Sequence, residues 1–378
     1  MSAFVLDENQ AMLADSARKY AARGYGDAVR SASLAHAHGC DPDRWGEFAE
    51  LGWLGLPLPE AHGGLGGTPA DMCVLAEELG RALVVEPWLS SAVLGGGLLA
   101  DAGDRAQCDT WLPALAAGEK RVAFAAWEPG SRFDAKRVDA RAEPFAGGFK
   151  LHGAKELAIG APGADALIVA ACVPDRRGLA LFVVPGDARG LEARAYALQD
   201  GRRAAHLRFD GVEVAASARL AGDIGAASAI ELALDRAMVV QCAETIGVMQ
   251  RAFEITLDYV KTRKQFGRVL AANQVLQHRL VDLYVSVEEG RALVRAAAHA
   301  FSGSREQRRS HAAAAKAYVA QAARTAWEES VQLHGAIGMT DEYVIGRYVK
   351  HLATSHTLFG DVDFHLERLA RSDLDPAS

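Results

Sequence analysis

The spacing of apolar positions changes twice along this chain of 378 residues. Up to about residue 118, apolar side chains recur at helical intervals, and Asp7 and Thr68-Pro69 are typical helix starts. Between about 119 and 222, short apolar or alternating runs are bounded by Gly, Pro or Asp, which predicts strands. Beyond residue 222 the helical spacing returns. The pattern predicts an N-terminal helical domain (1–118), a middle β domain (119–222) and a C-terminal helical domain (223–378).

The C-terminal domain is predicted to contain four long helices with short connections, an arrangement typical of an up-and-down four-helix bundle. The four segments are 223–262, 271–302, 306–336 and 341–372, with glycine breaks at Gly267, Gly303 and Gly338. In the middle domain, runs such as Val122–Ala125 and Leu179–Pro185 recur between turn residues, which favours an antiparallel β-barrel or sandwich. The predicted fold class is therefore α+β.

Composition narrows the class of protein. A formal net charge of -7 and a pI near 6.0 give no overall electrostatic basis for nucleic-acid binding. The five cysteines show no C-x-x-C spacing, which argues against a disulfide framework or a zinc site and favours a reducing compartment. The apolar stretch from Ala82 to Ala100 is interrupted by Glu86 and Pro87, so it is not a membrane span. Since the N-terminus also lacks a signal-peptide pattern, we expect a cytoplasmic protein without a metal.

Three segments of the last third carry candidate chemistry. They are Arg263-Lys264-Gln265-Phe266-Gly267, Gln274, and the run from Gln332 to Thr340. An arginine fork suits a pyrophosphate, and small residues allow a flat ligand to approach the backbone closely. The residues themselves indicate an anionic, partly aromatic ligand. Taken alone, the first segment is more typical of a solvated helix end.

Together and in this order, these segments resemble the cofactor-binding signature of the acyl-CoA dehydrogenase family. The run from Leu51 to Gly64 is similar to the family's first-domain signature, and the domain order is also the family's. The resemblance implies FAD and the α,β-dehydrogenation of an acyl-CoA thioester, in which a carboxylate removes the α-proton and a hydride passes to flavin N5. It places the following residues at the cofactor: Phe124, Ala126, Trp127, Arg132, Ile159, Arg263, Gln265, Phe266, Leu270, Asn273, Gln274, Gln332, Leu333, Gly335 and Ala336.

The chain departs from the family pattern around the flavin ring. The run Trp127 to Asp134 keeps the Glu-Pro pair and the aspartate of the family's flavin-covering motif, but Trp127 replaces a threonine and Arg132-Phe133 replace a Gly-Ser pair. Ile159 stands where the family has a threonine. The resemblance therefore implies a degraded ring-binding half and an intact helical half of the site.

The family's base, a glutamate directly before a glycine near the C-terminus, is also absent, because that pair is Phe359-Gly360 here. Two other carboxylates are candidates. Asp361 lies one residue further along, and Glu244 lies in a very apolar stretch of the first long helix of the C-terminal domain. A buried acid of this kind is also a common structural partner of arginine.

Several combinations, including Cys242-Ala243-Glu244 and Thr357 to Asp361, resemble the small-subunit branch of the family, typified by pimeloyl-CoA dehydrogenase. That resemblance implies a heterotetramer with a second acyl-CoA dehydrogenase subunit, with a homotetramer as the alternative, and electron-transfer flavoprotein as the electron acceptor. It also suggests a medium-chain or dicarboxylyl thioester and a role in fatty acid metabolism. Three hypotheses stay open: a catalytic dehydrogenase, a non-catalytic subunit that completes the partner's FAD site, and a flavin oxidase or monooxygenase of the same fold.

Overall fold

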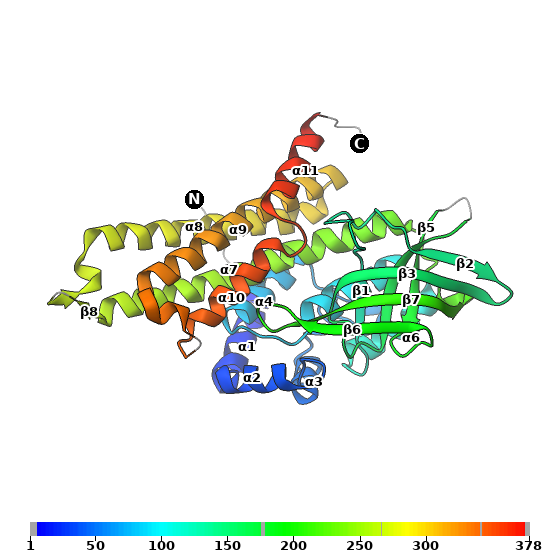
Figure 1. Ribbon diagram of the computed structural model, residues 1–378, viewed down its shortest axis with the longest axis horizontal. Helices are drawn as coiled ribbons and strands as arrows, with labels where there is room; N and C mark the ends of the chain where they lie inside the picture. Colours follow the sequence, from blue (N-terminus) through cyan, green and yellow to red (C-terminus); the bar gives the residue numbers. More distant parts are fainter. Residues whose placement is uncertain (1–5, 175–177, 266, 341, 375–378) are drawn as a thin grey trace. The chain divides into compact units, whose positions relative to one another are not determined.

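The computed structural model describes residues 6–174, 178–265, 267–340 and 342–374 (Figure 1). The chain forms two compact units, which are described separately. The helical unit comprises Met1–Arg30, Pro69–Val84 and Met238–Ser378, and the sheet unit comprises Ser31–Thr68 and Val85–Ala237. The helices α2 (Asp27–Ala35) and α7 (Ala226–Thr262) contain residues of both units.

The helical unit is built on long helices, of which α8 and α9 run side by side (Figure 1). Its helices besides α7 are α1 (Glu8–Gly24), α4 (Pro69–Arg81), α8 (Gln274–His299), α9 (Arg305–His334), α10 (Ile345–Thr357) and α11 (Val362–Leu374), with a short hairpin of β8 (Lys264–Gln265) and β9 (Arg268–Val269) after α7. The helix α1 begins where it was predicted, and Asp7 caps it in a reciprocal capping box with Gln10. Ser304 and Gln307 form a second capping box at α9.

Glycines let α4 and α7 touch backbone to backbone. A Cβ atom added at Gly247 would lie 1.8 Å from the carbonyl oxygen of Glu77, and one added at Gly80 would lie 2.1 Å from the carbonyl oxygen of Glu244. No side chain fits at either position, because both neighbouring atoms belong to helix backbone. The main chain at Glu244 is thereby fixed against α4.

The helix predicted over 341–372 is interrupted, and that prediction is wrong as a single helix. The helix α10 ends at Thr357 and α11 begins at Val362. In the turn between them, Phe359 has a φ of 62° and Gly360 a φ of 116°. A Cβ at Gly360 would lie 2.5 Å from Nε2 of His365, so glycine is required there for space as well as for conformation.

The sheet unit combines a curled seven-stranded sheet with short helices. The strands are β1 (Val122–Ala125), β2 (Arg141–Phe145), β3 (Gly148–Ile159), β4 (Ala166–Cys172), β5 (Leu179–Pro185), β6 (Leu191–Ala197) and β7 (Arg203–Ala215), in the order β1-β4-β2-β3-β7-β6, with β5 paired to β4. The helices are α3 (Pro42–Glu50), α5 (Gly97–Ala102), α6 (Arg105–Ala116) and a π-helix, η2 (Leu89–Gly96). The pairs β1–β4 and β2–β4 are parallel, so an entirely antiparallel sheet was the wrong expectation.

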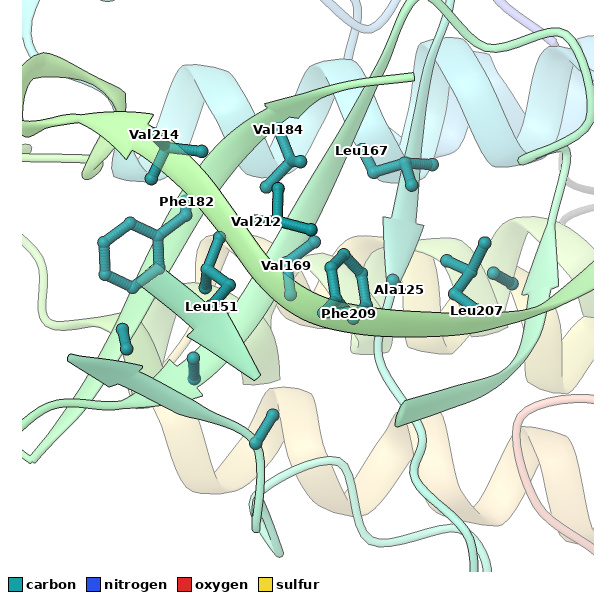
Figure 2. Close-up of a cluster of buried hydrophobic side chains, with 14 of the residues drawn as sticks. Ala125, Leu151, Leu167, Val169, Phe182, Val184, Leu207, Phe209, Val212 and Val214 are labelled. Atoms are coloured by element: carbon teal, nitrogen blue, oxygen red, sulfur yellow. The ribbon is translucent and has the colours of Figure 1, made fainter. Parts of the chain in front are cut away.

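One face of the curled sheet holds the core of this unit (Figure 2). Val169, Phe182, Leu207 and Phe209 are among the buried side chains that meet there. Ala125 belongs to the same cluster. Because successive side chains of a strand alternate between faces, Phe124 and Ala126 lie on the other face of the sheet. Ile159 lies there too, since its neighbour Ala158 is part of the core.

Candidate functional site

The structure pairs the segment that follows β1 with the end of β3. Trp127 pairs with Glu156 in an antiparallel bridge, and the Glu156 amide donates to the Trp127 carbonyl oxygen over 2.8 Å. Phe124 and Ala126 are buried, and Ile159 is half-buried. The ring-side residues predicted from the sequence therefore come from neighbouring segments of one sheet.

Hydrogen bonds within the loop from Trp127 to Asp134 and to the residues that follow it define its shape. The Glu128 amide donates to the Ser131 hydroxyl over 3.1 Å, and the Ser131 amide donates to the Glu128 carbonyl over 3.0 Å. The Asp134 amide donates to the Ser131 carbonyl over 3.1 Å, and the Asp134 carboxylate accepts from the Lys136 amide. Arg132 sits on this loop with a φ of 52°, a conformation that an arginine rarely adopts, and its side chain is exposed.

Glu128 fastens the loop to the sheet. Its Oε1 accepts from Nζ of Lys155 over 2.6 Å and from the Ala140 amide over 3.1 Å, and its Oε2 accepts from the Asp139 amide over 2.6 Å. The side chain of Lys155 is fully buried and that of Glu128 is 5% exposed. Burial lowers the pKa of Lys155, and the Glu128 hydrogen bond opposes that shift. Sequence reasoning noted Glu128 as part of a motif but did not identify Lys155 as its partner.

On the helical unit, the hairpin after α7 presents exposed polar groups. Arg263 and Gln274 make no side-chain hydrogen bond within the described residues, whereas Gln265 donates to the Lys264 carbonyl. Asn273 accepts from Arg268 and donates to the Leu270 carbonyl over 3.0 Å, which shapes the turn into α8. Phe266 lies outside the described residues.

The two helical segments predicted from the sequence meet through a stack of aromatic rings. At the end of α9, the His334 ring stacks on Tyr259 of α7 with 4.4 Å between centroids, and the Tyr259 hydroxyl donates to the His334 carbonyl over 3.3 Å. The Arg263 amide bonds the Tyr259 carbonyl, so Arg263 lies one helical turn away. Gln332, Leu333, Gly335 and Ala336 flank His334 and are brought to the same end of the unit.

His334 itself is a packed residue. It is 4% exposed, and its Nδ1 bonds the Ser330 carbonyl oxygen over 2.7 Å. Burial lowers its pKa, with the bond to Ser330 opposing the shift. Gln332, two residues earlier, is exposed and makes no side-chain hydrogen bond in the described part of the chain.

Asp361, the first of the two candidate bases, caps a helix. Its Oδ1 accepts from the Phe364 amide over 2.9 Å, at the start of α11. Two residues earlier, the Phe359 carbonyl accepts from Nε2 of His365 over 2.9 Å. Burial lowers the pKa of His365 to about 3, so the imidazole is neutral and donates through Nε2. The turn thus holds a buried phenylalanine where the resemblance places a glutamate.

Glu244, the second candidate, faces the interior of the helical unit. Its Oε2 lies 3.7 Å from Nε2 of His351 on α10, and the His351 side chain is 3% exposed. Glu244 is therefore placed beside an imidazole, which sequence reasoning did not anticipate.

Lys316 is a buried cation that sequence reasoning missed. It lies on α9 and is 1% exposed, and its Nζ donates to Oε1 of Gln241 over 3.0 Å and to the Ser355 carbonyl over 2.6 Å. Burial lowers its pKa to about 8. The only sequence signal was its position within a run of alanines from Ala312, and lysines are rarely buried. Lys316 ties α7 and α9 to the last turn of α10, next to the Phe359 turn.

Two kinds of feature are absent from the described residues. No group of three His, Cys, Asp or Glu side chains there is arranged to bind a metal. No helix in the same part of the chain combines the length and the apolar character that a membrane span requires.

Comparison with known proteins decides the family. Residues 7–119 match the acyl-CoA dehydrogenase N-terminal domain and residues 224–374 match the acyl-CoA dehydrogenase C-terminal domain. The acyl-CoA dehydrogenase IpdE2 of Mycobacterium tuberculosis is 30% identical over 363 residues, which cover 96% of each chain. The chain belongs to the acyl-CoA dehydrogenase family. Members of the family are oxidoreductases, and FAD is their cofactor.

Solved structures agree with this assignment. The Tcur3481-Tcur3483 steroid acyl-CoA dehydrogenase superimposes with a TM-score of 0.88 at 30% identity and covers 99% of both chains. The ChsE4-ChsE5 complex of Mycobacterium tuberculosis superimposes with a TM-score of 0.90 over 100% of both chains, and its 23% identity supports the fold alone.

The residues fit one half of FAD and not the other. In the helical unit, Arg263, Gln274 and Gln332 keep their donors unused within the described chain, which suits a pyrophosphate and an adenine. In the sheet unit, Trp127 and Ile159 have no hydroxyl to offer a flavin ring, and the amides of Glu128, Ser131 and Asp134 are already bonded. The division into an intact and a degraded half of the site stays a prediction.

Proposed function

We propose that this chain is one subunit of an FAD-dependent acyl-CoA dehydrogenase whose catalytic base belongs to a second chain of the same family. In this proposal the helical segments around Arg263, Gln274 and Gln332 hold the pyrophosphate and adenine end of FAD. The second chain supplies the carboxylate that removes the α-proton. Bound FAD supplies the redox chemistry, because it accepts the β-hydrogen of the thioester as a hydride.

The observation that carries this proposal is the set of contacts made at the three positions considered for the base, Phe359, Asp361 and Glu244. Phe359 cannot accept a proton, and its main chain is bonded to His365. The carboxylate of Asp361 accepts a hydrogen bond that caps α11. Glu244 faces His351 within the helical unit. A base must lie within hydrogen-bond reach of the proton that it removes, and none of these groups is a free carboxylate on an exposed turn.

Relatives support an assembly of two different chains. The steroid acyl-CoA dehydrogenase carries the paired designation Tcur3481-Tcur3483, and the ChsE4-ChsE5 structure is described as a complex. Another relative, 28% identical over 311 residues, is CarC of Acetobacterium woodii, a subunit of a caffeyl-CoA reductase-Etf complex. We therefore propose a heterotetramer rather than a homotetramer and electron-transfer flavoprotein as the acceptor. A cytoplasmic location, the medium-chain or dicarboxylyl substrate and the three domain boundaries stay predictions.

A second candidate function is that this chain is catalytic by itself with Glu244 as its base. The proximity of His351 favours it, because Nε2 of this imidazole lies 3.7 Å from the carboxylate of Glu244. No feature of the described residues favours an oxidase or a monooxygenase over a dehydrogenase.

The visible spectrum separates these candidates. The chain is purified alone and, separately, co-expressed with the proposed second acyl-CoA dehydrogenase chain, and each sample is mixed with medium-chain and dicarboxylyl-CoA thioesters. We expect a flavin band that bleaches only in the co-expressed complex, and we expect Glu244→Gln in this chain to leave the bleaching intact. Bleaching by the chain alone that Glu244→Gln abolishes would establish Glu244 as the base and refute the proposal.

A further inference from the structure

We infer that Tyr259, near the end of α7, is a positioning residue for the cofactor. It fixes the two chain segments that carry Arg263 and Gln332 relative to each other, so that the pyrophosphate and adenine end of FAD meets side chains that are already placed. This inference rests on the proposed function, and it adds to that function a residue that acts on FAD only through its neighbours.

Arg263 and Gln332 are not held in place by polar contacts of their own. Both side chains are exposed, and neither makes a side-chain hydrogen bond within the described residues. Their positions therefore depend on the main chain that carries them. Arg263 directly follows α7, whereas Gln332 lies in the last turn of α9. A ligand that bridges the two side chains binds more tightly if the two segments are already fixed, because less order must be created on binding.

Tyr259 is bonded to both segments. Its carbonyl oxygen accepts from the Arg263 amide over 2.8 Å, and the Arg263 carbonyl oxygen accepts from the Leu270 amide over 2.9 Å. The main chain of Arg263 is thus held at both of its polar groups. On the other side, the Tyr259 hydroxyl donates to the His334 carbonyl oxygen over 3.3 Å. His334 lies two residues beyond Gln332, in the same turn of α9.

A cluster of aromatic rings reinforces this link. The Tyr259 and His334 rings lie 4.4 Å apart between centroids, with 28° between their planes, and the Tyr343 ring lies 5.1 Å from that of His334. Nδ1 of His334 donates to the Ser330 carbonyl, and burial lowers the pKa of His334, so the stack joins two uncharged rings. One helical turn earlier, the buried Thr256 hydroxyl donates to the Ser330 hydroxyl over 3.5 Å. The helices α7 and α9 are therefore joined over two successive turns.

The affinity of the complex for FAD tests the inference. The full chain, co-expressed with the proposed second acyl-CoA dehydrogenase chain, is stripped of flavin and titrated with FAD, and the quenching of flavin fluorescence gives the Kd. Tyr259→Leu removes the ring stack and the hydroxyl, and we expect it to raise the Kd for FAD about tenfold. Tyr259→Phe keeps the stack and should raise the Kd only about threefold.

The rate of flavin bleaching by an acyl-CoA thioester at saturating FAD is measured on the same samples. We expect Tyr259→Leu to leave this rate unchanged, because Tyr259 acts on the end of FAD that lies away from the reacting ring. A general loosening of the fold would lower the rate and the affinity together. Combining Tyr259→Leu with His334→Leu should weaken FAD binding no more than Tyr259→Leu alone, since both changes remove the same stack.

Tyr318 is the matched control. It lies on α9 about 24 Å along the helix from His334, and its hydroxyl donates to Glu289 of α8. Tyr318→Phe and Tyr318→Leu remove the same chemical groups from the same helical unit. Both should leave the Kd for FAD unchanged.

Circular dichroism establishes that each variant complex is folded. A folded Tyr259→Leu complex with the wild-type Kd for FAD would overturn the inference and leave the proposed function standing, and so would a bleaching rate that falls together with the affinity. If Tyr259→Leu does not fold, Tyr259→Phe decides: its Kd should exceed that of Tyr318→Phe about threefold, and equal values would overturn the inference. A folded wild-type complex that binds no FAD would overturn the proposed function itself.

Discussion

Replacement of Glu128 by glutamine tests whether this motif residue is structural. The substitution removes one negative charge and leaves the shape of the side chain almost unchanged. In the folded chain, Lys155 would then lie fully buried without its counterion. The new amide would also place a donor against the Asp139 amide, which now donates to Oε2 over 2.6 Å.

The expected loss of stability follows from these contacts. Removal of one partner of a buried ion pair typically costs about 3–5 kcal/mol, because the remaining charge is uncompensated. That is a large share of the roughly 5–15 kcal/mol that stabilises a typical domain. Lys155→Met combined with Glu128→Gln removes both charges, and we expect this double variant to be more stable than the sum of the single changes predicts, by about 2 kcal/mol or more.

Urea denaturation followed by circular dichroism measures the free energy of unfolding of the wild type, the two single variants and the double variant. A loss below about 1 kcal/mol for Glu128→Gln would refute the reasoning, since that value is typical of an exposed pair. So would strict additivity of the two single changes. Either result would mean that water or a cofactor group, rather than Lys155, satisfies the carboxylate.

Three further predictions concern the helical unit. Burial lowers the pKa of Lys316 from 10.5 to about 8, so the unfolded chain binds more protons than the folded chain between these two pH values. The free energy of unfolding of the wild type, relative to that of Lys316→Met, should therefore rise by about 3 kcal/mol from pH 7.5 to pH 10.5. A difference between the two proteins that does not change with pH would contradict this. Gly247→Ala should lower the free energy of unfolding by about 1–3 kcal/mol, because the added Cβ forces α4 away from α7. Gly46→Ala is the control: its Cβ meets nothing within 4 Å, so it should stabilise α3 slightly. Equal effects of the two substitutions on the melting temperature would refute the close contact. Asp361→Asn should preserve both the stability and the thioester-dependent bleaching of the complex. Asp361→Ala removes the helix cap and should lower the free energy of unfolding by about 1 kcal/mol. Loss of bleaching in a folded Asp361→Asn complex would indicate that Asp361 is the base.

Periodicity and capping residues predicted much of the fold because they act locally. Asp7 and Pro69 begin helices where expected, and β1 and β5 have the predicted bounds. The strands β2 and β6 were missed, because most of their side chains are exposed and their sequences lack the alternation of a half-buried strand. Local patterns do not reveal which strands pair in parallel.

The candidate site was predictable only as far as side-chain type determines chemistry. Arg263 and Gln332 were recognised from motifs. In the structure, the rings of Tyr259 and His334, which lie near them in the sequence, stack on each other. The contacts that decide which side chains are available for chemistry could not be predicted from the sequence. They depend on tertiary contacts: Asp361 as a cap, Glu244 beside His351, and the Trp127 indole across its own loop.

Two hydrogen bonds to main-chain oxygens hold the turn between α10 and α11. His365 binds the main-chain oxygen of Phe359, and Lys316 binds the main-chain oxygen of Ser355. A substitution at 359 leaves both contacts in place. The two hydrogen bonds that hold the backbone here therefore do not depend on which functional group residue 359 carries. A proton acceptor at residue 359 can therefore be lost in a single step while both main-chain contacts of the turn persist.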